Sequence, residues 1–290
     1  MRVFALSDLH VDYRENMDHL DALSSREFQR DALILAGDVT DDLDKLTEVL
    51  VGARRRFGWV FFVPGNHELW VRRSETRDSV QKFHRIVARC AALGVSTQPT
   101  KIPGVGAEAS VWIVPLFSWY VKPEEGAESL FVEKGGDDAS LMMWADNHLT
   151  GWAGITSGEK VADFFMDMNE EHLRRQYDAP IVSFSHFLPR RELMFANGVP
   201  PESRPLGRKS GRGAQFNFSR VAGSTRLDRQ IRALGSRVHV YGHQHRNRDL
   251  TIGGVRYVSN CLGYPHERDR GETGDGSPGP KVVWDTGHRH

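Results

Sequence analysis

The sequence predicts an α/β fold, because short apolar strands alternate with amphipathic helices along most of the chain. Strand-like runs such as 32–36, 60–63 and 181–185 are bounded by polar or glycine residues. Apolar residues at helical spacing lie between the strands, most clearly over 74–93, where Gly94 follows as a stop signal. The strands also end abruptly in polar residues. In α/β proteins, the loops beyond strand ends carry the chemistry.

The predicted elements follow one another in a regular order. The strands are 3–6, 32–36, 60–63, 111–116, 181–185 and 238–241, followed by a hairpin of 248–252 and 255–260. The helices are 17–23, a helix from 41 or 42 to 57, 74–93, 159–177 and 225–234. Residues 282–284 are either an edge strand or part of a poorly ordered end. No repeat or linker divides the chain, so we predict one domain over 1–290, with 265–290 as a C-terminal extension.

Length and composition are those of an ordinary globular protein. The chain has 290 residues, of which 39% are hydrophobic and 26% are charged. Lys plus Arg and Asp plus Glu number 38 each, so the formal net charge is zero and no global field favours nucleic acid or an anionic membrane. No apolar run approaches the roughly 20 residues of a membrane span. We therefore expect no membrane or nucleic-acid partner and a cytoplasmic location.

The two cysteines lie in different settings, since Cys90 continues a helical stripe and Cys261 follows a strand. No Cys-x-x-Cys spacing is present. Two thiols in the core of a protein from a reducing compartment are therefore expected in place of a disulfide.

Residues 187–220 form a segment that is rich in Pro, Gly and Arg. Seven Lys or Arg residues against two Glu residues leave a local excess of five positive charges. A phosphate-binding lid or cap loop and a solvated flexible loop explain this excess about equally well. The position of the segment directly after His186 favours the lid slightly.

Five strand ends offer side chains of the kinds that bind metal ions. These side chains are Asp8 and His10, Asp38, Asn66 and His67, His186, and His243 with His245. Each group alone is weak evidence, because a surface pair or a Pro-Gly-Asn turn is the commoner explanation. Together they indicate a site for two ions. Mixed carboxylate, amide and imidazole ligands suit Mn²⁺, Fe or Zn²⁺, whereas a Ca²⁺ site would use oxygen ligands only.

In this order, the motifs resemble the signature of the calcineurin-like metallophosphoesterase superfamily. The motifs are Asp8-x-His10, Gly37-Asp38, Gly65-Asn66-His67-Glu68, His186 and Gly242-His243-x-His245. Segments 8–13, 115–120 and 262–265 are also similar to a little-characterised branch from plants and microbes. The resemblance implies a four-layer α-β-β-α sandwich, in which two mixed β-sheets are flanked by helices and a dimetal site lies at the strand-end loops.

The resemblance also implies a role for each site residue. One metal would be held by Asp8, His10 and His245, the other by Asn66, His186 and His243, and Asp38 would bridge them. Two such ions lower the pKa of a shared water, which attacks as hydroxide, and they stabilise the charge on the phosphoryl oxygens. His67 is then the general acid that protonates the leaving oxygen. Asp41 matches the carboxylate that orients His67, and its alternative role is the N-cap of the following helix.

The predicted function is dimetal-dependent hydrolysis of a small phosphodiester or nucleotide-type phosphate ester. The alternative is a phosphomonoesterase that acts on a small metabolite. Asp42 stands where protein Ser/Thr phosphatases carry a phosphate-binding arginine, and Glu68 differs from the ending found in lipid A pathway pyrophosphatases, so both of those substrate classes are disfavoured. The zero net charge disfavours a nuclease, and the complete set of ligands with His67 disfavours a non-catalytic scaffold.

Overall fold

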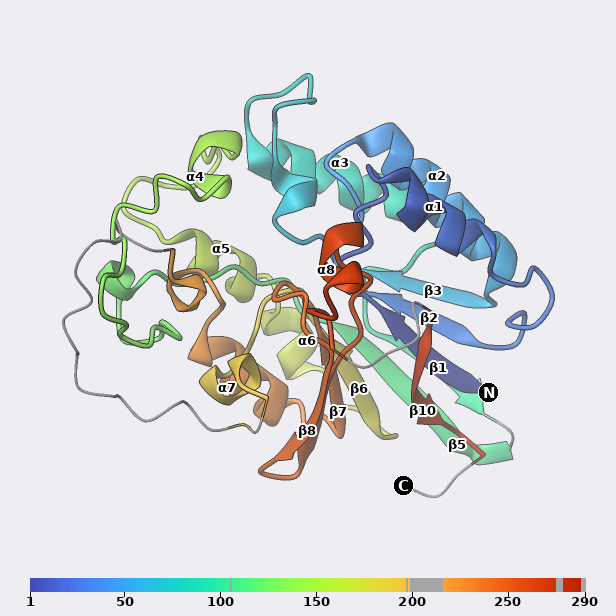
Figure 1. The fold of residues 1–290 in the computed structure, drawn as a ribbon. Coiled ribbons are helices and arrows are strands. Elements are labelled where there is room, and N and C mark those ends of the chain that lie inside the picture. Colours follow the sequence, from blue (N-terminus) through green and yellow to red (C-terminus); the bar gives the residue numbers. More distant parts are fainter. Residues whose placement is uncertain (105, 197, 199–215, 275–278, 288–290) are drawn as a thin grey trace.

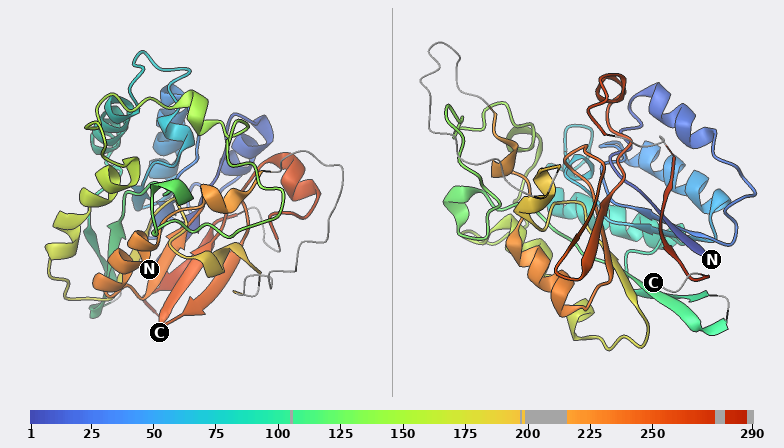
Figure 2. Two further views of the ribbon diagram at one scale, coloured as in Figure 1. Left: turned by 90° about the vertical axis from the view of Figure 1, so that its left-hand side faces the viewer. Right: turned by 60° about the horizontal axis from the view of Figure 1, so that its bottom comes forward.

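The computed structural model describes residues 1–104, 106–196, 198, 216–274 and 279–287. In this part of the chain, two mixed β-sheets pack together between flanking helices, as Figures 1 and 2 show. The smaller sheet has four strands in the order β10-β1-β2-β3, and the larger has six in the order β4-β5-β6-β7-β9-β8. The predicted α/β class and two-sheet architecture are confirmed.

The four-stranded sheet is built from parallel strands with one antiparallel edge. Its strands are β1 (Arg2–Leu6), β2 (Ala32–Leu35), β3 (Trp59–Phe62) and β10 (Lys281–Asp285). Strands β1, β2 and β3 are almost entirely buried, because helices cover one face of the sheet and the second sheet covers the other. β10 runs antiparallel to β1, with Val3 opposite Trp284. Residues 282–284 therefore lie in an edge strand, which was one of the two alternatives.

The six-stranded sheet has a parallel centre and antiparallel edges. Its strands are β4 (Thr100–Gly104), β5 (Gly106–Pro115), β6 (Ile181–Phe184), β7 (Val238–Tyr241), β8 (Arg248–Ile252) and β9 (Val255–Ser259). β4 and β8 are antiparallel to their neighbours, whereas β5, β6, β7 and β9 are parallel to one another. The sequence analysis did not predict β4. Its Pro103 is tolerated because the strand lies at an edge.

Helices lie on the outer flanks of the two sheets (Figure 1). Those beside the smaller sheet are α1 (Arg14–Asp21), α2 (Leu43–Arg56) and α3 (Ser79–Ala92), and those beside the larger sheet are α5 (Val161–Asp167), α6 (Glu170–Arg174) and α7 (Thr225–Ala233). Two further short helices are α4 (Asp146–Leu149) and α8 (Pro265–Asp269). Within the described residues, no helix is both long and apolar enough to cross a membrane.

Two predicted helices differ from the observed ones for local reasons. The helix expected from residue 74 begins at Ser79, because the Asp78 carboxylate caps it by accepting from the Val80 N–H at 3.0 Å. The helix expected over 159–177 is split into α5 and α6 near Asn169. The Asn169 carboxamide accepts from the Phe117 N–H and donates to the Phe117 carbonyl, and these bonds tie the break to the end of β5.

The ends of the two sheets are joined where β1 and β9 finish. The Ser7 N–H donates to the Asn260 carbonyl, and the Leu262 N–H donates to the Ser7 carbonyl, both at 3.0 Å. Ser7 also forms a bridge with Cys261. The loops that follow the parallel strands of both sheets therefore meet in one place. Cys90 and Cys261 are both buried and free, as expected.

The predicted lid at 187–220 lies partly outside the described residues, which lack 197 and 199–215. Three of its arginines can be followed, and each has a protein partner. Arg190 pairs with Asp228 at 2.7 Å, Arg220 pairs with Asp137 at 2.7 Å, and Arg191 donates to a backbone carbonyl. These three side chains therefore serve to anchor the two ends of the segment.

Candidate metal centre

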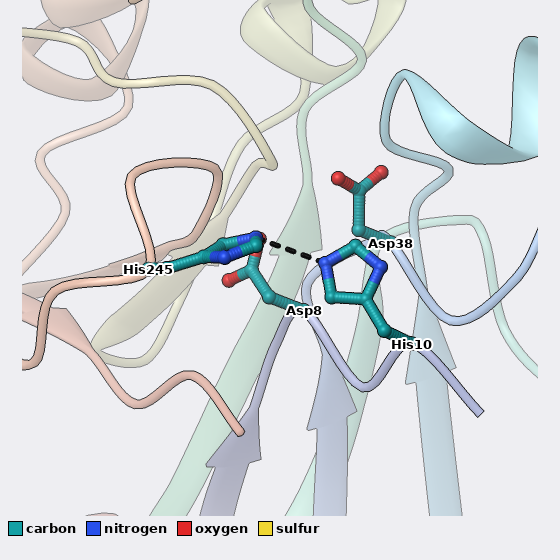
Figure 3. Close-up of side chains that lie close together, drawn as sticks. All are labelled: Asp8, His10, Asp38 and His245. Carbon is teal, nitrogen blue, oxygen red and sulfur yellow. Dashed lines mark hydrogen bonds and ion pairs between the residues drawn. The ribbon is translucent and has the colours of Figure 1, made fainter. Parts of the chain in front are cut away.

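Asp8, His10, Asp38 and His245 form one buried group, and one potential ligand atom of each lies within 4.8 Å of the others. All four residues stand on loops just beyond strand ends (Figure 3). The Nε2 atoms of His10 and His245 face each other at 2.9 Å. The Nδ1–H of His245 donates to the Glu267 carboxylate at 2.6 Å, which leaves a lone pair on the Nε2 of the neutral ring.

A second buried group consists of Asp38, His186 and His243, with potential ligand atoms again within 4.8 Å of one another. The Nδ1–H of His186 donates to the Ala36 carbonyl at 2.9 Å, and its Nε2 lies 3.1 Å from the Oδ1 of Asn66. The Nε2–H of His243 donates to a backbone carbonyl at 2.9 Å, which leaves its Nδ1 as the free nitrogen. Asp38 is common to both groups.

These outer hydrogen bonds test whether the residues fit metal ions. A carbonyl or a carboxylate only accepts, so it fixes the tautomer of the imidazole that it contacts. His186, His243 and His245 each have one nitrogen held in this way, and the other nitrogen is left as a potential ligand. The structure thus brings together six of the seven predicted ligands in two groups that share Asp38, and the seventh, Asn66, lies beside His186. This donor set suits two transition-metal ions.

The backbone at the site is strained in a way that serves these side chains. Outside glycine, six described residues have a positive φ, and five of them are predicted ligands: Asp8 (51°), His10 (43°), Asp38 (55°), His243 (74°) and His245 (53°). Each such residue costs about 1 kcal/mol or more, so surrounding interactions must hold it in place. Strain of this kind is typical of functional sites.

The Glu68 carboxylate helps to hold the strained backbone of these loops in place. It accepts from four backbone N–H groups: Gly65 at 2.7 Å, Asp38 at 2.9 Å, Val39 at 2.5 Å and Thr40 at 3.1 Å. Glu68 therefore ties the loop after β2 to the loop after β3. Burial raises the pKa of Glu68 to about 7, although the N–H groups favour its charged form. From the sequence, Glu68 could be recognised only as the end of a motif.

Two glycines are required by close packing at the same place. A Cβ on Gly65 would collide with the Asp38 carboxylate and the His186 ring. Gly37 has a φ of 80°, and a Cβ there would lie 2.6 Å from the Nδ1 of His186. Gly65 is therefore needed for the approach of Asp38 and His186, in addition to ending the strand before it.

Burial and mutual charge shift the pKa values of these residues strongly. Burial lowers the pKa of His10 and of His243 well below the usual value, so both rings are neutral. Burial also opposes the charge on Asp38, but the nearby His186 and His67 hold the pKa of Asp38 well below its usual range. In the metal-free site, the charged Asp38 and the neutral His10 and His243 can bind a cation directly. Against the effect of burial, nearby carboxylates raise the pKa values of His186 and His245, so each of these rings must release a proton when a metal ion binds.

His67 lies beside both groups. Its main-chain N–H donates to the Oδ1 of Asp38 at 2.9 Å, and its ring Nε2 is 3.8 Å from the Oδ2 of Asp38. Its ring centroid is 3.6 Å from that of Trp70 and 4.6 Å from that of His10. Burial lowers the pKa of His67 to about 4, so the free site holds a neutral imidazole. A bound phosphate anion would raise this pKa.

Asp41 is not the N-cap of the helix that follows it. Asp42 is the N-cap of α2, since its side chain accepts from the N–H groups of Asp44 and Lys45. The N-cap alternative for Asp41 is therefore wrong. The Asp41 carboxylate accepts from the Nε–H of Arg72 at 2.5 Å, and no hydrogen bond joins it to His67 within the described part of the chain. Orientation of His67 by Asp41 stays a prediction.

Two carboxylates that were not predicted from the sequence contact the predicted ligands. Asp146, in α4, accepts from the Nδ2 of Asn66 at 2.9 Å and from the Nε1 of Trp70 at 2.7 Å. Glu267 accepts from His245 and also caps the first turn of α8. Pro265 followed by Glu267 is a helix-start pattern that could have revealed α8. No local signal distinguishes Asp146.

Comparison with known proteins decides the family. A model of the calcineurin-like phosphoesterases matches residues 1–247. The chain belongs to the calcineurin-like phosphoesterase family. It is therefore a metal-dependent phosphoric ester hydrolase, and the family is dimetal-dependent, in agreement with the two buried groups of this phosphoesterase.

One curated relative of this phosphoesterase is the [acyl-carrier-protein] phosphodiesterase PptH of Mycobacterium tuberculosis. The two are 29% identical over 277 residues, which cover 91% of this chain and 78% of the relative. The crystal structure of the phosphopantetheinyl hydrolase PptH from the same organism superposes with a TM-score of 0.72 and 23% identity, over 97% of this chain and 95% of that chain. The superposition supports the fold.

Proposed function

We propose that this phosphoesterase hydrolyses a phosphodiester at a site that holds two metal ions. Asp8, His10 and His245 would hold one ion, Asn66, His186 and His243 would hold the other, and Asp38 would be shared. The observation that carries this assignment is the outer hydrogen bonding, which leaves one free nitrogen on each of His186, His243 and His245. When bound, two such ions activate water and stabilise negative charge on phosphoryl oxygens.

His67 has the position of a general acid. Its ring lies against Asp38 and His10 and does not belong to either potential ligand group. The pKa of His67, about 4 in the free site, would rise beside an anionic phosphate, so the ring gains a proton where the leaving oxygen needs one. The Trp70 ring, 3.6 Å away, holds the imidazole in one orientation.

The first candidate substrate is the phosphodiester that joins a phosphopantetheinyl arm to a carrier protein. Support comes from the names of the mycobacterial relative, a phosphodiesterase of acyl carrier protein and a phosphopantetheinyl hydrolase, and from a match over 91% of this chain. A small diester or a nucleotide-type ester is the second candidate, and a small phosphomonoester is the third.

An apolar rim beside the second group suits a substrate with a sizeable organic part. The Trp144 ring lies 5.9 Å from that of His243 and stacks on Phe216 at 5.2 Å. The neighbouring Met142 and Met143 are 72% and 84% exposed. These apolar side chains would favour an extended organic ligand over a bare phosphate.

The decisive experiment is a substrate panel with Mn²⁺-loaded protein. The panel contains bis-p-nitrophenyl phosphate, p-nitrophenyl phosphate, cyclic nucleotides, nucleoside polyphosphates and a phosphopantetheinylated acyl carrier protein. We expect diesters to be hydrolysed faster than p-nitrophenyl phosphate and chelator to abolish turnover. Faster hydrolysis of the monoester, or turnover that survives chelation, would contradict the proposal.

The His67→Ala variant tests the general acid in the same panel. An alkoxide such as that of the carrier protein needs a proton on leaving, whereas p-nitrophenolate is stable without one. We therefore expect a loss of about 10²- to 10⁴-fold on the carrier protein and a much smaller loss on bis-p-nitrophenyl phosphate. Equal losses on both substrates would remove His67 from that role.

A further inference from the structure

Arg72 lies close to the metal centre and is held there by a buried carboxylate. Its Nε–H donates to the Oδ2 of Asp41 at 2.5 Å. The Asp41 side chain is fully buried, whereas the Arg72 side chain is 42% exposed. The Asp41 main-chain carbonyl accepts from the Nζ of Lys82 at 2.6 Å, which fixes this part of the loop. A fixed buried acceptor therefore determines where a half-exposed guanidinium stands.

A stack of three side chains connects Arg72 to the proposed general acid. The guanidinium carbon of Arg72 is 5.1 Å from the Trp70 ring centroid, and the Trp70 ring is 3.6 Å from that of His67. The His67 ring in turn lies 4.6 Å from the ring of His10, which belongs to the first metal group. Arg72 is thus linked through Trp70 and His67 to the first metal group.

The Arg72 guanidinium has hydrogen-bond donors that are not used within the protein. An arginine carries five N–H donors, and Asp41 takes only the one on Nε. Within the described residues, the four N–H groups on the two Nη atoms of Arg72 have no hydrogen-bond partner. The neighbouring Arg73 differs, because its Nη1 lies 3.0 Å from Asp12 and 3.3 Å from Asp41. Of these two adjacent arginines, only Arg72 has both Nη atoms without a hydrogen-bond partner among the described residues.

We propose that Arg72 binds an anionic oxygen of the substrate's phosphate group, and that Asp41 positions Arg72 for this contact. The inference rests on the proposed function of the same site. A paired Nη fork matches the oxygens of a phosphate, and such contacts are stronger than neutral hydrogen bonds. The role of Asp41 is then to restrict the guanidinium, since an arginine held in one orientation loses less entropy on binding.

The first test measures phosphate binding without turnover. Inorganic phosphate is titrated calorimetrically into Mn²⁺-loaded wild type, Arg72→Ala, Arg72→Lys and Arg73→Ala, after metal content and melting temperature are checked. We expect Arg72→Ala to weaken phosphate binding at least about tenfold, Arg72→Lys to weaken it less, and Arg73→Ala to stay within about twofold. Wild-type affinity in Arg72→Ala, or an equal loss in Arg73→Ala, would overturn the inference.

The second test asks through which residue Asp41 acts. We expect Asp41→Asn to weaken phosphate binding in the wild-type background and to change it by less than about twofold in Arg72→Ala. An undiminished effect of Asp41→Asn in Arg72→Ala would show that Asp41 acts elsewhere and would overturn the positioning role. The Arg72 variants still test phosphate binding if Asp41→Asn does not fold.

Failure of the inference differs from failure of the proposed function. If wild type hydrolyses the diester panel while Arg72→Ala binds phosphate normally and keeps wild-type KM, only the inference is wrong. If the metal-loaded wild type hydrolyses no ester of the panel, the proposed function on which the inference rests is wrong.

Discussion

The Oδ1 of Asn66 lies 3.1 Å from the Nε2 of His186, and with a neutral ring neither atom has a hydrogen to donate. Asn66 uses its Nδ2 on Asp146, and His186 uses its Nδ1–H on the Ala36 carbonyl. A cation between the two atoms satisfies both. Without a metal, a proton takes its place, because Asp38 raises the pKa of His186 to about 9 against the effect of burial.

The Asn66→Ala substitution should therefore prevent binding of the second metal ion. We expect metal analysis after gel filtration to find close to one ion per chain in Asn66→Ala and two in wild type, and diester hydrolysis to fall at least about hundredfold. Asn147→Ala is the matched control, since Asn147 bonds to Lys122 and a backbone carbonyl away from the ligands. Two ions in Asn66→Ala would refute the assignment of Asn66.

Glu267→Gln should weaken the first metal site. The Glu267 carboxylate contacts the Nδ1 of His245 at 2.6 Å, and loss of such an outer partner typically lowers metal affinity about 10- to 100-fold. Competition with a chromogenic chelator measures the affinity. The control is Glu272→Gln, because Glu272 pairs at 3.3 Å with Arg246. If the two variants bind metal equally well, Glu267 does not support the site.

The Glu68→Gln substitution should destabilise the protein. An amide has one acceptor oxygen and adds N–H groups that face the four backbone donors, so buried donors are left unsatisfied. We expect a loss of about 2 to 4 kcal/mol in the free energy of unfolding by urea. Glu48→Gln, on the exposed side of α2, should change it little. A Glu68→Gln variant as stable as wild type would show that Glu68 does not tie these loops.

The ligands could be predicted from sequence because they are local features. Each lies directly after a short apolar strand, and parallel strands bring such ends together. Asp38 and His186 could therefore be placed in one site, although 147 residues lie between them in the sequence. The two-sheet arrangement followed from the family resemblance, because strand patterns alone do not show which strands pair.

The supporting residues could not be predicted because their roles depend on distant contacts. Asp146 reaches Asn66 across 80 positions, and Arg72 reaches Asp41 across 31. The break near Asn169 depends on a backbone group of Phe117. None of these side chains differs locally from an ordinary polar residue, so only the folded chain distinguishes them.

His239 should make the protein sensitive to acid. It is buried on β7 between the hydroxyls of Ser183 and Ser185, at 2.9 and 3.0 Å, and burial lowers its pKa to about 3. In the unfolded chain, His239 gains a proton below its ordinary pKa of about 6.5. In the native state, it gains the proton only when the pH falls to about 3. The contribution of the neutral His239 ring to the free energy of unfolding is thus complete above about pH 6.5 and is lost as the pH falls toward 3.

Urea unfolding at pH 7 and pH 5 measures this effect. We expect His239 to account for about 2 kcal/mol of the decrease in unfolding free energy between the two values. His239→Gln should therefore show a smaller decrease than wild type, whatever its absolute stability. An identical decrease in both proteins would show that His239 does not resist protonation in the folded state.

Our proposal requires two metal ions that share Asp38, both of them needed for diester hydrolysis. The most direct measurement is the rate of bis-p-nitrophenyl phosphate hydrolysis as Mn²⁺ is added to chelator-treated protein, with bound metal determined at each point. We expect little activity up to one ion per chain, a rise as the second ion binds, and no rise in Asp38→Asn. Full activity with one ion per chain, or in Asp38→Asn, would contradict it.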